Sequence, residues 1–336
     1  MAKINTLIAN DFPPNISIWD EIPIYKNFKH EVNNDSDILL ITAGDSWTWG
    51  ASLDPDKRID QIYGTRLCHK LQCDFINIGL LGGDNLSIIQ AVDFVINNLS
   101  KQYKQIYVVI TLTELGRETR SSFLWKKSDY VNLSGPDWPT FEEIIHATEN
   151  NEKLNFALEE LQTMAPLVYF ELCNWIKLRT IKSFDEWLIA LDKINLEQLS
   201  TVKNNVKHHN VTWVVGKNFV NWISANDNIL ANCIKLEHIW TDIISQQGNL
   251  EKYPSDCIAG VMRTGRDPII DFCNAHQFDN SKQHLVNLFE NSLLAHDWFD
   301  LSPFNDSRRD HSRHPFQEAH QWWADYIYSN IEKKKL

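Results

Sequence analysis

Two segments that lie far apart in the chain carry residues that could perform nucleophilic catalysis together. Ser46 ends a Gly-Asp-Ser tripeptide directly after the apolar run Ile38 to Ala43, and His314 opens the last helical pattern of the chain. A serine hydroxyl becomes a strong nucleophile when a nearby base removes its proton, and a carboxylate commonly orients that base. The two segments therefore indicate an acyl-transfer site, provided that the fold brings them together.

The elements that must position these residues alternate between strand and helix. Short unalternating apolar runs predict buried strands, and apolar residues three or four positions apart predict helices. The expected strands are 38–43, 74–78, 106–112, 211–215 and 297–301, with helices at 57–72, 85–100 and 281–295 and a last helix after His314. This order predicts an α/β fold with a doubly wound parallel sheet of about five strands. Ligands of such sheets bind beyond the carboxyl ends of the strands, where Ser46 is expected.

The domain organisation follows from where this alternation holds. Residues 1–36 are expected to be irregular, because prolines interrupt any period there. Residues 37–119 and 206–332 are expected to form one α/β domain. Residues 120–205 show helical periodicity without a clear strand, and we interpret them as a helical insertion. The pattern does not decide whether this insertion caps the site or supports the domain from outside.

Composition and charge exclude several classes of partner. The formal net charge of −12 disfavours nucleic acids, whose phosphates reward clustered Lys and Arg. The six cysteines lack paired C-x-x-C spacing, so we expect buried free thiols rather than a zinc or redox site. The sequence has no membrane-spanning run and no signal-peptide pattern, and we therefore expect a cytoplasmic protein. Neither a cofactor nor an oligomeric state is indicated.

Three short blocks, in order along the chain, carry a resemblance to a known family. The first is Gly44 to Ser46 after the first expected strand, and the second is the N-I-G-L-L-G block, Asn77 to Gly82, after the next one. The third is the H-P-F-Q-E-A-H block, His314 to His320, in which Ala319 replaces a glycine of the family pattern. With these blocks the chain resembles the SGNH hydrolases, also called the GDSL esterases and lipases. The resemblance covers roughly residues 37–116 and 205–330 and implies a flavodoxin-like three-layer sandwich.

The resemblance also implies roles for individual residues. Ser46 would be the nucleophile, His314 the base, and the amides of Ser46 and Gly82 part of the oxyanion hole. The simpler alternative is that Ser46 caps the helix that follows it and His314 is a turn residue.

The acidic residue departs from the family pattern. The family places an aspartate three residues before its histidine, where this chain has His311. Asp310 lies four residues before His314, and on a helical turn both spacings face the same side. We therefore expect Asp310 to orient the base, with Asp306 as the fallback. The dense histidines here could also suggest a metal site, but without a second cluster the pattern is nonspecific, and we expect none.

A second departure lies after the third expected strand. The family has an asparagine there that donates to the oxyanion, whereas this chain reads T-E-L-G-R-E at 113–118. Glu114 is expected to point away and pair with Arg117, because a carboxylate would oppose the developing charge. Thr113, Asn85 or Arg117 could replace the missing donor. Losing such a donor outright costs on the order of ~3 kcal/mol of barrier.

Together these patterns favour a serine esterase. The expected substrate is a small-molecule or glycan ester, such as an O-acetyl group on a carbohydrate, and this expectation rests on the family alone. Trp47 could stack on that substrate, although core packing explains most tryptophans. Two alternatives stay open: a catalytically quiet binding or assembly protein on the same scaffold, and an O-acyltransferase with the same triad.

Overall fold

The structure is a computed structural model of the 336-residue chain. It describes residues 3–6, 29–33, 35–51, 53–80, 83–99, 102–113, 115, 174, 177–178, 180–206, 210–218, 222–247, 272–273, 276, 284, 287–288 and 314–335.

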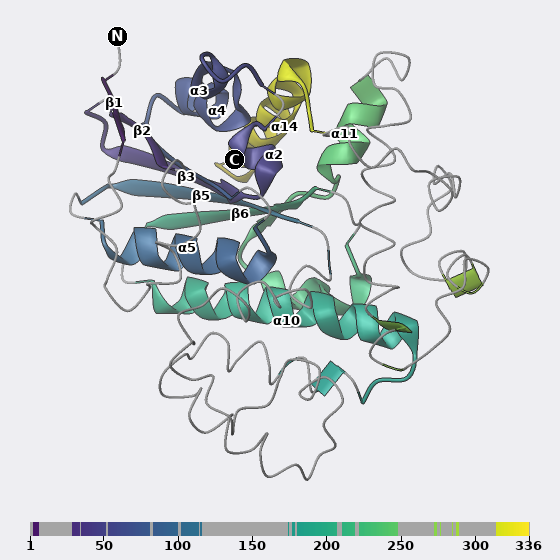
Figure 1. Cartoon of the computed structure of the whole chain (residues 1–336). Coiled ribbons are helices and arrows are strands. Elements are labelled where there is room, and N and C mark those ends of the chain that lie inside the picture. Colours follow the sequence, from purple (N-terminus) through teal and green to yellow (C-terminus); the bar gives the residue numbers. More distant parts are fainter. Residues whose placement is uncertain are drawn as a thin grey trace, which may run out of the picture.

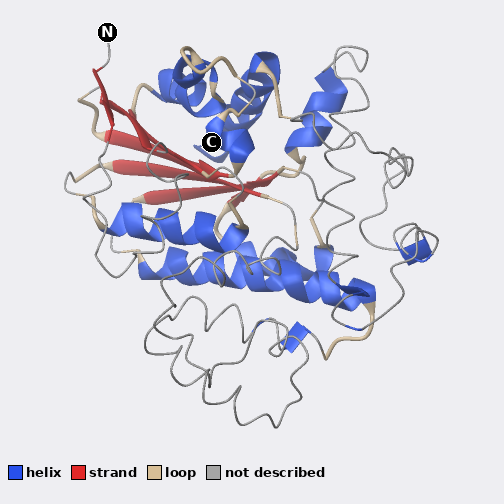
Figure 2. Cartoon of the chain, viewed as in Figure 1, coloured by secondary structure: helices blue, strands red, loops and turns tan. Residues whose placement is uncertain are grey.

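A seven-stranded sheet with the order β1-β2-β4-β3-β5-β6-β7 lies at the centre of the molecule (Figures 1 and 2). Neighbouring strands β4, β3, β5, β6 and β7 are parallel to one another, and β1 and β2 continue the sheet antiparallel beyond β4. The strands are β1 (Lys3–Thr6), β2 (Lys29–Asn33), β3 (Ile38–Gly44), β4 (Asp74–Gly79), β5 (Gln105–Leu112), β6 (Val211–Lys217) and β7 (Ile234–Lys235). The parallel part has the strand order of a flavodoxin-like fold.

Helices cover both faces of this sheet, so the molecule has three layers (Figure 1). Helices α2, α3, α4, α11 and α14 lie on one face, and α5 and α10 lie on the other. The helices are α2 (Ser46–Trp49), α3 (Arg58–Gln61), α4 (Tyr63–Leu71), α5 (Asn85–Asn97), α10 (Phe184–Asn205), the 3-10 helix η5 (Ser224–Leu230), α11 (Trp240–Gln247) and α14 (Gln317–Lys335). None of the described helices is long and apolar enough to cross a membrane.

The apolar runs of the parallel strands explain this architecture. Successive side chains of a strand point to opposite faces, so a strand covered on both sides needs apolar residues throughout. In β3, Leu40 joins the core under α4 and α14, whereas Leu39 and Ile41 join the core under α5 and α10. Ile41 pairs in register with Ile76 of β4 and Val108 of β5. The sheet is therefore held by two separate apolar cores.

The strand predictions are confirmed for the first four parallel strands, β3 to β6. The helix predicted at 57–72 is present but broken at Ile62, whose ψ of 151° ends α3 and precedes α4. The described fifth parallel strand is β7, within a segment that has little sequence pattern. Its length of two residues is too short to leave an apolar run. The strand expected at 297–301 and the helix expected at 281–295 lie largely or wholly outside the described residues.

The prediction that residues 1–36 are irregular is wrong for β1 and β2. These strands pair through the backbone at the β4 edge of the sheet, and backbone pairing does not require an apolar pattern. Their sequences, KINT and KHEVN, are accordingly poor in apolar residues.

The assignment of 120–205 to an insertion is wrong for its last part, α10. This helix lies between β5 and β6 in the chain, and its buried Leu196, Leu199 and Val202 complete the core on the α5 face. Helical periodicity indicates a helix but not the layer against which it packs. The preceding residues up to 173 lie outside the described part of the chain.

The cysteine prediction is confirmed where the structure describes these residues. Cys68, Cys73 and Cys273 are buried, Cys233 is partly buried, and none of these four forms a disulfide. The other two cysteines, at positions 173 and 257, lie outside the described residues.

Candidate active site at the carboxyl edge of the sheet

The hydroxyl of Ser46 and the imidazole of His314 meet beyond the carboxyl end of β3. The distance between Ser46 Oγ and His314 Nε2 is 2.8 Å, although the two residues are 268 positions apart in the chain. This is hydrogen-bonding distance for a hydroxyl and a ring nitrogen. Ser46 is 8% exposed and His314 is partly buried. The fold thus brings together the serine and the histidine that the sequence analysis predicted.

Ser46 occupies the first position of a single helical turn, α2, immediately after β3. Asp45 caps this turn, because its carboxylate accepts a hydrogen bond from the backbone N–H of Trp47 at 2.9 Å. Gly50 ends it with a φ of 81°, a conformation that favours glycine. A side chain at Gly44 would collide with the Thr48 hydroxyl and lie 3.0 Å from the Thr111 carbonyl oxygen. The small residues of this corner therefore let α2 turn tightly against the sheet.

The Asp45 carboxylate ties α2 to two neighbouring strands. It accepts hydrogen bonds from Asn218 Nδ2 at 2.8 Å and from the Thr113 hydroxyl at 2.7 Å. Thr113 directly follows β5 and Asn218 directly follows β6. Asp45 is fully buried, and a buried carboxylate needs such donors to replace lost hydration. A turn of four residues, which is too short to be stable alone, is thereby held in place.

The second sequence block holds α2 from the β4 side. Asn77 Oδ1 accepts a hydrogen bond from the Thr42 hydroxyl at 2.7 Å, and its Nδ2 lies 3.4 Å from the Thr48 carbonyl oxygen. Gly79 pairs in register with Gly44, and a side chain at Gly79 would lie 2.6 Å from the Trp49 Cα. The block therefore allows the close approach of α2 to the end of β4.

A buried tyrosine links α2 to the strand end from inside the helical layer. The Tyr63 hydroxyl lies 3.3 Å from the Thr48 hydroxyl and 3.2 Å from that of Thr111. Burial raises the pKa of Tyr63 to about 12, so this phenol stays protonated at neutral pH.

The third block places His314 three residues before α14 begins. Within this helix, His320 is fully buried and its Nδ1 accepts a hydrogen bond from the Tyr63 backbone N–H at 3.2 Å. Burial, together with the positive charge of Arg66, lowers the pKa of His320 to about 3, so its ring is neutral at neutral pH. Ala319, at the glycine position of the family pattern, is fully buried against Trp240, whose Nε1 donates to its carbonyl oxygen at 3.2 Å. This packing accommodates a methyl group.

Two suggested substrate or oxyanion contacts are not supported by the geometry. The Thr113 hydroxyl donates its proton to Asp45, so that proton is used inside the protein. Trp47 is only 3% exposed and packs edge to face on Trp240, with ring centroids 5.3 Å apart. Both residues are structural, because their side chains point into the protein, a direction that their position in the sequence does not reveal.

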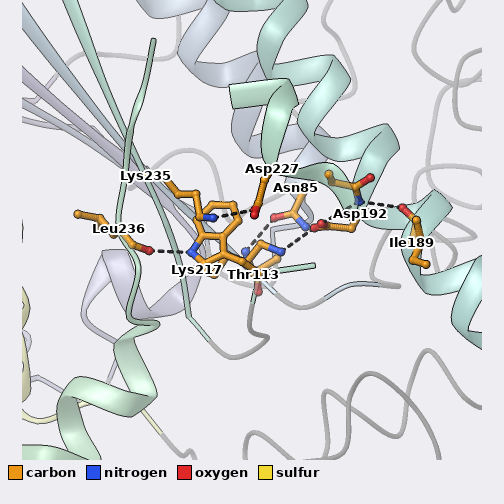
Figure 3. A network of polar contacts seen from close by, with 10 residues as sticks. Asn85, Thr113, Ile189, Asp192, Lys217, Asp227, Lys235 and Leu236 are labelled. Atoms are coloured by element: carbon orange, nitrogen blue, oxygen red, sulfur yellow. Dashed lines mark hydrogen bonds and ion pairs between the residues drawn. The ribbon is translucent and has the colours of Figure 1, made fainter. Parts of the chain in front are cut away.

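Of the other predicted site residues, only Asn85 lies in the part of the chain that the structure describes. Asn85 is buried at the start of α5, and its Oδ1 accepts a hydrogen bond from the Thr113 backbone N–H at 2.8 Å (Figure 3). This contact points the donor end of the Asn85 amide away from Thr113. Outside the described residues lie Gly82, Glu114, Arg117, Asp306, Asp310 and His311.

Sequence reasoning missed two residues that contact this site. Asn218 has a detectable signal, because it is the polar residue that follows a strand at the ligand-binding edge of the sheet. Tyr63 has no such signal, because it lies on the apolar face of α4 like an ordinary core residue.

The described arrangement can carry nucleophilic chemistry but contains no cluster suited to a metal ion. Among the residues that the structure describes, no group of three or more His, Cys, Asp or Glu side chains is placed to hold one. Comparisons of the chain with protein-family models, curated proteins and solved structures found no match.

Proposed function

We propose that this protein is a serine ester hydrolase of the SGNH type that acts through an acyl-serine intermediate. The observation that carries the proposal is the 2.8 Å contact between Ser46 Oγ and His314 Nε2. A nucleophile and its base must lie within this distance for direct proton transfer. The three ordered sequence blocks support the same proposal, and each described block contributes to the placement of Ser46 or His314.

In the proposed reaction, His314 Nε2 accepts the proton of the Ser46 hydroxyl while Oγ attacks the ester carbonyl carbon. The carbonyl oxygen becomes an oxyanion, and by the resemblance the amides of Ser46 and Gly82 donate to it. Collapse of this intermediate breaks the bond to the alcohol oxygen, which takes the proton from His314. Water then attacks the acyl-serine with His314 again as base, and the carboxylic acid and free Ser46 are released.

The substrate class is proposed from the resemblance alone. An O-acetyl ester on a carbohydrate is a substrate type of this family, and the bond cleaved would be its acyl carbon–oxygen bond. The buried position of Trp47 removes one residue that could have stacked on a sugar. Recognition of the alcohol therefore falls to other residues of this edge.

A fluorophosphonate probe tests the nucleophile directly. We expect the probe to label the wild-type protein on Ser46, and we expect labelling to disappear in Ser46→Ala and to fall by at least about a hundredfold in His314→Ala, because the hydroxyl then lacks its base. Peptide mapping by mass spectrometry identifies the labelled residue. A folded wild-type protein that resists the probe would favour a binding or assembly protein.

The same assay separates the two possible acids. Asp310→Asn should slow labelling strongly, whereas Asp306→Asn should leave it near the wild-type rate, because we propose that Asp310 orients His314. The opposite ranking would transfer that role to Asp306. Release of acetate from an acetyl ester, measured with and without added sugar acceptors, then distinguishes hydrolysis from acyl transfer.

A further inference from the structure

Two consecutive residues at the end of β6 reach opposite layers of the molecule. Lys217 Nζ lies 2.6 Å from Asp192 Oδ1 on α10. A dashed line in Figure 3 marks this contact. The next residue, Asn218, donates from Nδ2 to Asp45 Oδ1 at 2.8 Å, on the side of α2. Alternation of side chains along an extended chain accounts for this division. The end of β6 thus connects the α10 layer with the residue that precedes Ser46.

The Lys217 contact fixes this strand end firmly. The side chains of Lys217 and Asp192 are 2% and 1% exposed, so the pair is shielded from water. Asn226 Nδ2 also donates to Asp192 Oδ2, at 3.2 Å. The Trp222 ring lies 4.7 Å from Lys217 Nζ, within the range of a cation–π contact. Separating buried charges is costly, and the position of β6 is therefore well defined where Asn218 begins.

The backbone of Asn218 is fixed by hydrogen bonds of both its N–H and its carbonyl group. Its backbone N–H donates to the Leu112 carbonyl oxygen at 2.9 Å, and its carbonyl oxygen accepts from the Thr241 N–H at 3.2 Å. The residue is fully buried. Its side-chain amide therefore has little freedom to move away from Asp45.

The orientation of this amide carries a free-energy cost. Asn218 Oδ1 is buried and has no hydrogen-bond partner among the described residues. Leaving a buried acceptor unsatisfied is unfavourable, and such an arrangement persists where another requirement sets the geometry. Here the requirement is a donor for the Asp45 carboxylate, because the reversed amide would place an oxygen against it.

We propose that Asn218 is a positioning residue for the nucleophile and acts through Asp45. Asp45 precedes Ser46 and caps α2, so the position of its carboxylate sets the direction of the Ser46 hydroxyl toward His314. This proposal rests on the proposed esterase function. It extends the site to β6, which none of the three sequence blocks includes.

Substitution of Asn218 by aspartate tests the proposal with little change in volume. Asn218→Asp puts a second carboxylate against Asp45, and mutual repulsion holds one proton on the pair or separates the two groups. We expect fluorophosphonate labelling of Ser46 at pH 8 to fall at least about tenfold, because small displacements of reacting groups are costly. The ratio of variant to wild-type rates should rise as the pH falls toward 5. With an acetyl ester, kcat should fall while KM stays nearly constant.

A control variant separates positioning from folding. Asn226→Asp is the matched control. The Asn226 side chain also donates to a buried carboxylate, but this carboxylate belongs to Asp192 and not to Asp45, which caps the turn that contains Ser46. This variant should lower the melting temperature without a pH-dependent change in the rate ratio.

The outcomes distinguish this proposal from the esterase proposal. If the wild-type protein is labelled and Asn218→Asp reacts at the wild-type rate at every pH, Asn218 has no positioning role. The same conclusion follows if Asn226→Asp reproduces the effect while near-UV circular dichroism shows that both variants are folded. If the folded wild-type protein is not labelled at all, both proposals fail.

Discussion

Among the individual residues of this site, Gly79 contributes by having no side chain. Gly79 lies where the backbone of α2 passes over the end of β4, and an added Cβ would stand 2.5 Å from the Trp49 nitrogen and 2.6 Å from its Cα. Backbone atoms cannot rotate away as the tip of a side chain can. The glycine therefore sets how closely α2, the turn that contains Ser46, approaches the sheet.

We predict that Gly79→Ala displaces α2 and slows labelling of Ser46 by at least about tenfold, with a loss of stability of about 1–3 kcal/mol. Gly216→Ala is the matched control in β6, because its Cβ would meet only side-chain atoms, of Leu236 and Trp323, at 2.9 Å. Urea unfolding and labelling kinetics measure the two effects. Equal labelling rates for both variants would contradict this account of Gly79.

The residues that could be predicted from the sequence are those with short local motifs. Ser46 and His314 each stand in a recognisable block next to an expected strand or helix, and the structure brings them together. For Thr113 and Trp47 the sequence indicates a position at this edge but not the direction in which the side chain points. For Asn218 the position after a strand could be read from the sequence, but its contact with Asp45 could not.

At the scale of elements, the buried Lys217–Asp192 pair joins β6 to α10. Each of its charges lies deep between the sheet and the helix, so each depends on the other for compensation. A helix that sequence periodicity assigned to an insertion is thereby fixed to the parallel sheet. Periodicity identified α10 as a helix, but long-range charge pairing of this kind leaves no local pattern.

We predict that Lys217→Met destabilises the protein by about 3–5 kcal/mol, because Asp192 would remain buried without its cation. The double variant Lys217→Met with Asp192→Leu should recover most of this loss by replacing the ion pair with apolar packing. The free energies of unfolding in urea provide the comparison. A double variant as unstable as Lys217→Met alone would show that the pair is not the main contact between these elements.

At the scale of the whole molecule, His320 couples stability to pH. Its neutral ring is packed between α4 and α11, where Trp240 meets it edge to face at 5.1 Å. Its pKa is about 3 in the folded protein, below the ordinary value of 6.5, so the unfolded chain binds this proton first. The contribution of His320 to stability is therefore complete above pH 6.5 and is lost as the pH falls toward 3.

We predict that His320→Asn reduces this acid sensitivity while Asn Oδ1 still accepts from the Tyr63 N–H. The gap between the two pKa values, 6.5 and about 3, corresponds to up to about 5 kcal/mol. The wild-type protein should be the more stable at pH 7, and the difference should narrow toward pH 4. Urea unfolding at several pH values tests this, and a constant difference would contradict it.

The apolar runs of four strands were enough to predict the parallel sheet. The strands at its two edges could not be predicted in this way. Strands β1 and β2 carry polar sequences and pair through the backbone, and β7 is only two residues long. Such elements are stabilised by the sheet that they join rather than by their own composition. Local pattern therefore revealed the interior of the sheet better than its edges.

The wide separation of Ser46 and His314 has a consequence for the protein while it is being made. The serine corner leaves the ribosome early, but its histidine partner follows 268 residues later. Until then, a growing polypeptide has the alcohol without this imidazole. Under the proposed function, every incomplete translation product that stops short of His314 would therefore lack the base that activates Ser46.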